Sequence, residues 1–194
     1  MTSFKASSCH SLNGSIKVPG DKSISHRSIM LGSIANGVTN VSGFLEGEDS
    51  FATLRAFQQM GVQIDRTGSN IAIHGVGKHG LKSPSEPLDL ANSGTSIRLM
   101  SGLLSAQSFN SQLCGDDSLS KRPMARIIEP LRMMGAKIDS NESKPPLSII
   151  GNQKLSAINY TLPVASAQIK SCLLLAGLYA KGETCIVENN TTRD

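Results

Sequence analysis

The sequence predicts a mixed α/β (α+β) domain that repeats one unit along the chain. Residues 54–65 recur at 128–139, and both copies carry a Met-Gly pair at the end of a helical pattern. A short alternating run closed by a glycine follows each copy. A partial third copy starts at residues 180–186, which resemble residues 35–41. Because a long internal repeat dictates the architecture, we read the chain as three related units, the third of them incomplete.

Each unit contains the same elements in the same order, an apolar helical pattern followed by a β-branched run. The predicted first helices lie at 26–36, 95–106 and 168–180, and the strands after them at 38–43, 109–114 and 183–188. Second helices are predicted at 50–60 and 123–134, and the strands that close the units at 62–65 with 70–74 and at 136–139 with 146–150. Leading strands are predicted at 14–18 and 157–162. Each unit is therefore a βαβαββ module.

Residues that cap or break helices mark the ends of the second helices. Asp49 is the predicted N-cap of one, and Pro123 is the predicted first residue of the other. Gly61 and Gly135 are predicted to stop them as C′ residues. Pro130 lies inside the later helix and should kink it or lower its stability. Linkers rich in Gly, Ser, Pro and Lys are expected at 77–87 and 140–146.

These elements divide the chain into a leading segment, residues 1–15, and one domain, residues 16–194. The units cover about 16–80, 85–152 and 155–194. On the register of the repeat Asp49 corresponds to Asp194, so the third unit stops where its second helix should begin. We therefore expect the chain to be truncated.

Composition narrows the possible partners. The 194 residues carry a net charge of +4 but no block of Lys and Arg, and two Tyr, five Phe and no Trp offer little base stacking. We therefore expect no nucleic acid partner, and small anionic substrates fit the charge better. No apolar run approaches a membrane span, and no secretory signal precedes the domain, so we expect no membrane contact and a cytoplasmic location. The four cysteines and four histidines show no metal-ligand spacing, and Cys172 and Cys185 are expected to be buried thiols.

Three similar segments open the first helices of the units, at 19–27, 90–98 and 163–170. Each leads from small polar or cationic residues into an apolar run. The first turn of a helix leaves backbone N–H groups free and carries partial positive charge, so it suits an anion. Three such helix starts from related units could surround one anionic ligand.

Lys22, Ser23 and Arg27 are candidates for contact with phosphate or carboxylate oxygens, because Lys offers a mobile charge and Arg a planar fork. The alternative is two solvated charges and a helix cap. Gly94 would let a ligand approach the backbone closely, or it serves only the turn.

Arg122 precedes a predicted helix and is either a further anion contact or the partner of Asp116 or Asp117 in a surface salt bridge.

Two other patterns are weaker evidence for a functional site. Residues 75–80 spell GxGxxG, but turn residues rather than a helix follow, which argues against a dinucleotide site. Cys114 lies in a predicted strand, where core packing is favoured over a nucleophilic role.

Five segments together resemble the 5-enolpyruvylshikimate-3-phosphate synthase family. They are residues 19–27, 92–98, 115–124, 165–171 and 192–194, in family order and at family spacing. The resemblance implies a two-domain enolpyruvyl transferase fold. Each domain is built from three βαβαββ units around a pseudo-threefold axis, and helix starts from both domains face the cleft between them. The leading segment, residues 1–15, would pack with the second domain.

The resemblance also implies a reaction and its residues. The family transfers the enolpyruvyl group of phosphoenolpyruvate to the 5-hydroxyl of shikimate 3-phosphate and releases phosphate, with no metal or organic cofactor. Lys22 and Arg122 would be catalytic. The residues toward shikimate 3-phosphate would be Lys22, Ser23, Arg27, Ser166, Ala167, Gln168 and Arg193. Those toward phosphoenolpyruvate would be Lys22, Gly94, Arg122 and Gln168.

Two alternatives to this function stay open. A sibling family uses UDP-N-acetylglucosamine as acceptor, but it usually bears a Cys where this chain has Asp117. A non-catalytic anion-binding module is the other. Members of the resembled family are more than twice as long and carry the general base in the other domain, so we expect this chain alone to be inactive and the full-length protein to be monomeric.

Overall fold

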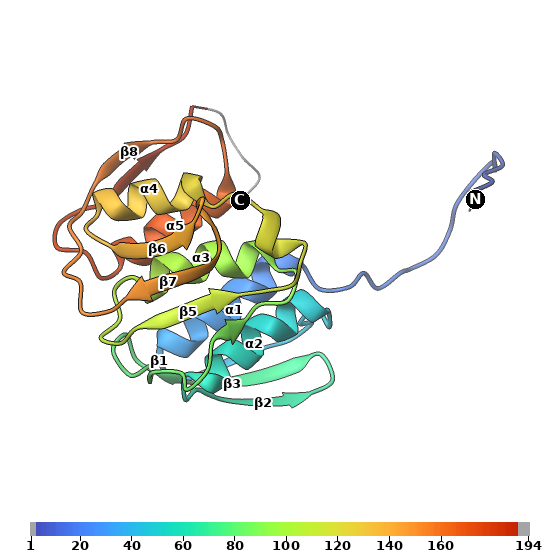
Figure 1. The fold of residues 1–194 in the computed structure, drawn as a ribbon. Coiled ribbons are helices and arrows are strands. Elements are labelled where there is room, and N and C mark those ends of the chain that lie inside the picture. Colours follow the sequence, from blue (N-terminus) through green and yellow to red (C-terminus); the bar gives the residue numbers. More distant parts are fainter. Residues whose placement is uncertain (1–2, 190–194) are drawn as a thin grey trace.

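Helix α3 (Gly94–Leu104) runs through the middle of the molecule, and nine of its eleven residues are buried. The computed structural model describes residues 3–189. In it Ile97, Leu99, Met100 and Leu103 are fully buried. Four helices pack against it (Figure 1), namely α1 (Lys22–Ile34), α2 (Glu48–Gln59), α4 (Ala125–Met133) and α5 (Ala167–Gly177).

The first unit closes with an antiparallel sheet in the order β1-β3-β2. Its strands are β1 (Asn36–Val41), β2 (Gln63–Thr67) and β3 (Asn70–Val76). Ile71 and Ile73 of the central strand are buried, and α1 packs against that strand. The alternation of buried and exposed residues along β3 is what a sheet with one covered face requires.

The second unit has a similar sheet, in the order β4-β5-β7-β6. Its strands are β4 (Leu88–Asp89), β5 (Ser111–Cys114), β6 (Lys137–Asn141) and β7 (Lys144–Ile150). Strands β5, β7 and β6 pair antiparallel, whereas β4 pairs parallel with β5. A 3-10 helix, η1 (Leu119–Lys121), precedes α4. The remaining elements are α5 and the parallel pair β8 (Asn159–Thr161) and β9 (Cys185–Val187).

The strand predicted at 14–18 is absent from the described residues. Residues 3–19 are all exposed and extend away from the body (Figure 1). A strand needs hydrogen-bonded neighbours, and no strand within residues 3–189 pairs with this stretch. The packing of residues 1–15 with a second domain stays a prediction.

The first helices begin earlier than their apolar pattern predicts. Helix α1 starts at Lys22 rather than residue 26, because Asp21 caps it and the polar residues of the first turn are already helical. For the second helices, the predictions at Gly61 and Gly135 are confirmed, with φ of +87° and +99° directly after the C-caps. Helix α4 runs on past Pro130 to Met133.

Two predicted helix starts are wrong. Asp49 is not an N-cap, since α2 begins at Glu48 with Gly47 as its cap, and Asp49 lies in the first turn. Pro123 is not a first helical residue, since α4 begins two positions later and its N-cap is Met124. Both residue types are common near helix starts. In this fold, however, the Asp49 side chain pairs with Lys22, and the Pro123 carbonyl accepts a hydrogen bond from Arg98.

Two further predictions need correction. Residues 140–146 are a hairpin rather than a linker, and Glu142 and Ser143 connect β6 to β7 with φ of +49° and +54°. Such left-handed pairs match the twist of the adjoining strands. Of the two cysteines expected to be buried, Cys172 is buried, but Cys185 is exposed because β9 lies at the surface.

Candidate functional site

Three helices start with the same cap. Asp21, Ser93 and Ser166 are the N-caps of α1, α3 and α5. In each, the side-chain oxygen accepts a hydrogen bond from the backbone N–H three residues on, at 2.8, 3.2 and 3.4 Å respectively. This is the local geometry that small polar side chains favour at a helix start. The three segments singled out in the sequence therefore all open helices, as predicted.

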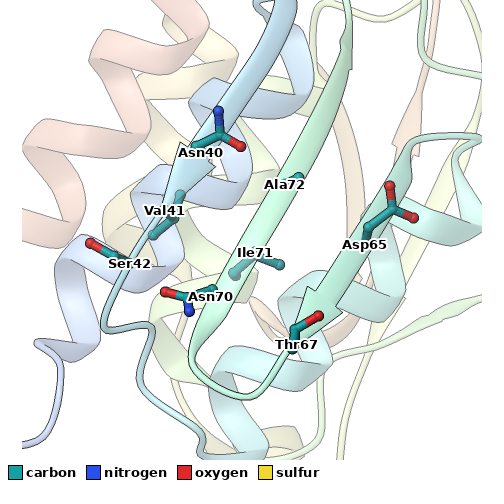
Figure 2. Close-up of a pocket in the computed structure, with 8 residues that line it drawn as sticks. All are labelled: Asn40, Val41, Ser42, Asp65, Thr67, Asn70, Ile71 and Ala72. Carbon is teal, nitrogen blue, oxygen red and sulfur yellow. The ribbon is translucent and has the colours of Figure 1, made fainter.

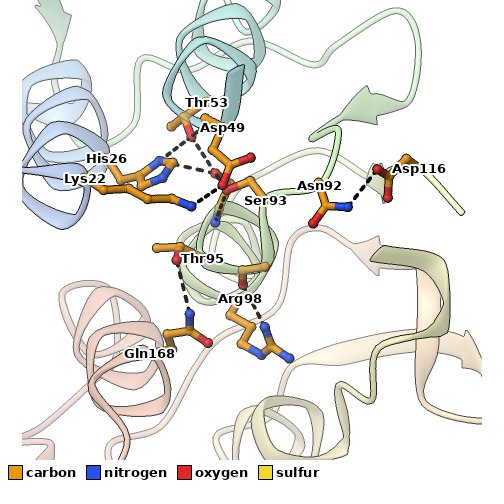
Figure 3. Close-up of polar contacts among 12 residues, drawn as sticks. Lys22, His26, Asp49, Thr53, Asn92, Ser93, Thr95, Arg98, Asp116 and Gln168 are labelled. Atoms are coloured by element: carbon orange, nitrogen blue, oxygen red, sulfur yellow. Dashed lines mark hydrogen bonds and ion pairs between the residues drawn. The ribbon is translucent and has the colours of Figure 1, made fainter. Parts of the chain in front are cut away.

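Side chains from these first turns reach across to one another. Gln168 Nε2 of α5 donates to Thr95 Oγ1 of α3 at 3.1 Å. Arg27 Nη2 of α1 donates to Ser171 Oγ of α5 at 2.8 Å. Figure 3 looks along α3 and shows Lys22, Thr95 and Gln168 around its start. The helix starts of the three units are thus gathered at one end of the helical layer.

In the first unit the positive charge is paired. Lys22 Nζ forms an ion pair with Asp49, which lies in the first turn of α2 (Figure 3). The Lys22 side chain is half exposed, so water screens the pair and its contribution to stability is small. A mobile ammonium group held this loosely remains available to an anion.

In the second unit two guanidinium groups lie over Gly94. Arg98 donates through Nη1 to the Gly94 carbonyl at 2.9 Å and through Nη2 to the Pro123 carbonyl at 3.2 Å. Arg122 donates to Asn92 Oδ1. A β-carbon added at Gly94 would lie 2.8 Å from an Nη1 atom of each arginine. Glycine therefore leaves room for both cations at the start of α3.

The cations of the second unit repel one another. Burial lowers the pKa of Arg98, and the nearby charges of Arg122 and Arg126 lower it further. Within residues 3–189 none of these three arginines forms an ion pair with a carboxylate. Positive groups that crowd together without counter-charges favour an anion beside them.

The salt bridge considered for Arg122 does not form in the described part of the chain. Asp116 instead accepts from the backbone N–H of Leu119 and from Asn92 Nδ2, each at 2.8 Å. The bond from Leu119 is the main cause that lowers the pKa of Asp116, followed by the bond from Asn92, and the charge of Arg122 adds least. Asn92 lies between the acid and the guanidinium and bonds to both.

A cleft of about 420 Å³ joins these cations to the third unit. Arg98 and Arg126 line one part of it, and Ser166 and Gln168 at the start of α5 line another. A different hollow, of about 380 Å³, lies on the sheet of the first unit (Figure 2). Uncharged side chains and Asp65 line that hollow without a cation, so it does not suit an anion.

The structure brings most of the predicted site residues to the helix starts. Lys22, Ser23, Gly94, Ala167 and Gln168 lie in first turns, Ser166 is a cap and Arg122 follows η1. Arg27 is one turn further along α1, and its guanidinium points toward α5. Arg193 lies outside the described residues.

Sequence reasoning missed three polar residues of this region, Asp49, Asn92 and Arg98, as parts of the site. The sequence offers Asp49 as a cap and as a position of the repeat, and Asn92 and Arg98 as members of the segment at 90–98 that opens a helix. The available signal was spacing, because Arg98 follows Gly94 by one helical turn and so lies over it.

Within residues 3–189 no three His, Cys, Asp or Glu side chains are grouped as metal ligands would be, and none of the helices has the length and apolarity to cross a bilayer.

Comparison with known proteins adds a family to this geometry. The family model for EPSP synthase (3-phosphoshikimate 1-carboxyvinyltransferase) matches residues 7–194. The chain belongs to this family. Membership confirms the resemblance that the five sequence segments indicated.

Relatives of the EPSP synthase family align along the whole chain. A 3-phosphoshikimate 1-carboxyvinyltransferase of Ruthia magnifica is 66% identical over 194 residues, which are 100% of this chain and 45% of the relative. One from Legionella pneumophila strain Paris is 56% identical over 195 residues, again 45% of its length. The EPSP synthase structure from Acinetobacter baumannii matches with a TM-score of 0.90 and 59% identity, covering 93% of this chain and 41% of that one. The chain therefore spans less than half the length of these relatives.

Proposed function

We propose that this chain supplies the phosphate-binding part of the active site of a 3-phosphoshikimate 1-carboxyvinyltransferase. The activity moves the enolpyruvyl group of phosphoenolpyruvate to the 5-hydroxyl of shikimate 3-phosphate and releases phosphate. One observation carries the proposal. Capped helix starts from three units gather at one end of the molecule, beside Arg98, Arg122 and Arg126, none of which forms an ion pair with a carboxylate among residues 3–189.

Shikimate 3-phosphate is assigned to the starts of α1 and α5. Lys22, Ser23 and Arg27 would contact it from α1, and Ser166, Ala167 and Gln168 from α5. Ala167 has no polar side-chain atom, so its contact would be through the backbone N–H at the free end of the helix. Arg193 belongs to this set by its place in the family motif.

Phosphoenolpyruvate is assigned to the start of α3. Lys22, Gly94, Arg122 and Gln168 would contact it, and Gly94 supports the assignment because a β-carbon there would lie 2.8 Å from Nη1 of both Arg98 and Arg122. As the 5-hydroxyl oxygen adds to C2 of phosphoenolpyruvate, the hydroxyl loses its proton and C3 gains one, which gives a tetrahedral intermediate. The bond between C2 and the phosphate oxygen then breaks as C3 loses a proton, so the C2–C3 double bond forms again and phosphate leaves. Lys22 and Arg122 would stabilise charge on the phosphate oxygens during both steps.

The domain organisation is part of the same proposal. Helix α2 packs against α1 and α3, and α4 packs against α3 and α5. Between α5 and α1 lies an apolar groove of about 210 Å³, lined by Met30, Leu31, Leu174, Leu175 and Leu178 among others. We propose that a third helix of the same kind occupies this groove in proteins of the relatives' length, which completes the third βαβαββ unit and the pseudo-threefold arrangement.

Calorimetric titration of the 194-residue chain tests the function. We expect shikimate 3-phosphate to bind, and Lys22→Met to weaken binding at least tenfold, whereas Lys137→Met on the exposed side of β6 should leave it unchanged. The chain alone should show no phosphate release from the two substrates. Mixing it with the remaining segment of a relative should restore release. Binding without release in the mixture would favour a non-catalytic anion-binding module, and no binding at all would overturn the proposal.

The cytoplasmic location and the monomeric state stay predictions.

A further inference from the structure

A polar network is buried where the first turns of α1, α2 and α3 meet. His26 Nδ1 lies 2.8 Å from Thr53 Oγ1 and 3.3 Å from Ser96 Oγ. The two hydroxyl oxygens are 2.6 Å apart, and Ser96 Oγ is also 2.6 Å from Ser93 Oγ, the cap of α3. His26, Thr53 and Ser96 are each 0% exposed. Figure 3 shows His26 of α1 beside Thr53 of α2. One imidazole therefore joins three helices from two units.

The network lies one turn below the charged groups of the candidate site. His26 follows Lys22 by four positions on α1, and Thr53 follows Asp49 by four positions on α2. Residues at this spacing on a helix stack on one face. Thr53 Oγ1 also donates to the Asp49 carbonyl at 3.3 Å, so the two layers are bonded to each other. A shift in the lower layer would move Lys22 relative to Asp49 and the start of α3.

The imidazole in this place is neutral. Burial, aided by the charges of Lys22 and Arg27 and opposed by that of Asp49, lowers the pKa of His26 to about 4. A proton on Nδ1 satisfies the network best, because Nδ1–H then donates to Thr53 Oγ1 while the Thr53 hydroxyl donates to the Asp49 carbonyl. Nε2 has no hydrogen-bond partner within the described residues. A leucine would remove that unpaired group, so stability alone does not explain a histidine here.

We propose that His26 is a positioning residue, whose bonds to Thr53 and Ser96 set the first turns of α1, α2 and α3 against one another and so hold Lys22 in place for a phosphorylated substrate. Buried polar networks specify one arrangement of their elements, whereas apolar contacts at the same place tolerate sliding. The inference rests on the proposed function, since shikimate 3-phosphate is the ligand that Lys22 is assigned to bind.

The test measures the dissociation constant of shikimate 3-phosphate and the thermal unfolding midpoint of each variant of the 194-residue chain. His26→Leu keeps the volume and removes both bonds, so the dissociation constant should rise at least tenfold. His26→Asn keeps a hydrogen-bonding group near the Nδ1 position and should stay within threefold of the wild type. Ser33→Ala is the matched control. Ser33 is also fully buried on α1, seven positions further on, and its Oγ has no partner among the described residues.

A structural role alone predicts another pattern. His26→Leu would then change the unfolding midpoint and leave the dissociation constant at the wild-type value, which would overturn the inference. If His26→Leu does not fold, Thr53→Val decides, because it removes the α2 hydroxyl with little change of shape. A rise of at least fivefold in the dissociation constant of Thr53→Val supports the inference, and a value within twofold overturns it. Absence of binding by the wild-type chain is a separate result, which refutes the proposed function and with it this inference.

Discussion

The first and second units share an architecture but differ between the strand that follows the first helix and the second helix. Their three antiparallel strands have equivalent orders, β1-β3-β2 and β5-β7-β6, and their second helices both end before a left-handed glycine. The shift between the units is 68 positions at Gly47 and Gly115 but 74 positions at Gly61 and Gly135. Residues 119–124 of the second unit account for the difference, and they contain η1 and Arg122.

This insertion changes the electrostatics of an otherwise similar helix start. In the first unit α2 begins directly after Gly47, and Asp49 in its first turn pairs with Lys22. In the second unit the extra turn brings Arg122 to Asn92 and leaves it beside Arg98 without a carboxylate partner in the described chain. The same architecture therefore holds Lys22 in an ion pair with Asp49 in the first unit, but holds Arg98 and Arg122 without an ion pair in the described part of the second unit. The difference lies in a few residues outside the regular elements.

Helix packing provides the strongest test of how the units differ. A β-carbon on Gly102 of α3 would overlap the backbone carbonyl of Cys172 in α5, whereas one on Gly32 of α1 would meet the ends of the Ile73 and Thr39 side chains at 3.0 to 3.3 Å. Because a backbone cannot move aside as a side chain can, Gly102→Ala should lower the free energy of unfolding by about 3 kcal/mol or more and Gly32→Ala by about 1 kcal/mol. Urea unfolding of both variants measures this, and equal losses would show that the α3–α5 contact is not closer than that of α1 with its sheet.

Acid should destabilise the first unit more than the second, because the buried His26 lies on α1 of the first unit. Burial holds the pKa of His26 near 4 in the folded chain, against 6.5 ordinarily, with Lys22, Arg27 and Asp49 as the charged groups around it. Between those pH values the unfolded chain binds a proton that the folded chain does not. Stability is therefore retained above pH 6.5 and falls by up to about 3 kcal/mol as pH drops toward 4.

The variant His26→Asn isolates this effect, because asparagine does not titrate. The difference in unfolding free energy between wild type and variant should change with pH from 7 to 4, and His10→Asn in the exposed leading segment should leave the wild-type slope intact. A slope that is the same in His26→Asn and wild type would assign the acid sensitivity to other groups.

The substitution Arg122→Lys tests whether the insertion at residues 119–124 serves phosphoenolpyruvate binding. In a protein of the relatives' length, losing the planar fork should lower kcat/KM for phosphoenolpyruvate at least tenfold and change the affinity for shikimate 3-phosphate less than threefold, since charged hydrogen bonds contribute about 1.5–3 kcal/mol each. Steady-state kinetics with each substrate varied in turn give both values. Lys121→Met, which removes the neighbouring charge, is the control and should stay within twofold. If the phosphoenolpyruvate kinetics of Arg122→Lys were unchanged, Arg122 would be a surface residue that does not contact phosphoenolpyruvate.

The sequence predicts that the segments at 19–27, 90–98 and 163–170 open helices, although α1 begins at Lys22 rather than residue 26. This much can be predicted because capping is local: Asp21, Ser93 and Ser166 each bond to a backbone N–H three positions away. The pairing of Lys22 with Asp49 spans 27 positions, and that of Arg122 with Asn92 spans 30. Such contacts depend on how the helices pack, which no local pattern encodes. The same limit explains why Asp49 was expected as a cap.

Turns and edges show the other limit of prediction. The hairpin at Glu142 and Ser143 lacks the glycine or asparagine that usually signals left-handed backbone, so its residues resembled a linker. The cross-strand ladder of β6 and β7 overrides that local preference. The segment 14–18 has the alternation of a strand, but pairing requires a neighbour that residues 3–189 do not offer.

Gly94→Ala is expected to give the smallest change in phosphoenolpyruvate affinity, and it compares the helix start of the second unit with that of the first. The added methyl group would press on Nη1 of Arg98 and Arg122, which are flexible ends and can move outward. Phosphoenolpyruvate should therefore bind three- to tenfold more weakly, while the free energy of unfolding changes by less than about 1 kcal/mol because alanine favours the helix. The matched control in the first unit is Gly47→Ala, where the nearest atom to a new β-carbon is 3.9 Å away. That variant should keep its phosphoenolpyruvate affinity and lose some stability at the α2 cap. Gly94 would serve only the turn if its variant lost stability at unchanged affinity, and calorimetric titration together with urea unfolding of both variants separates the two roles.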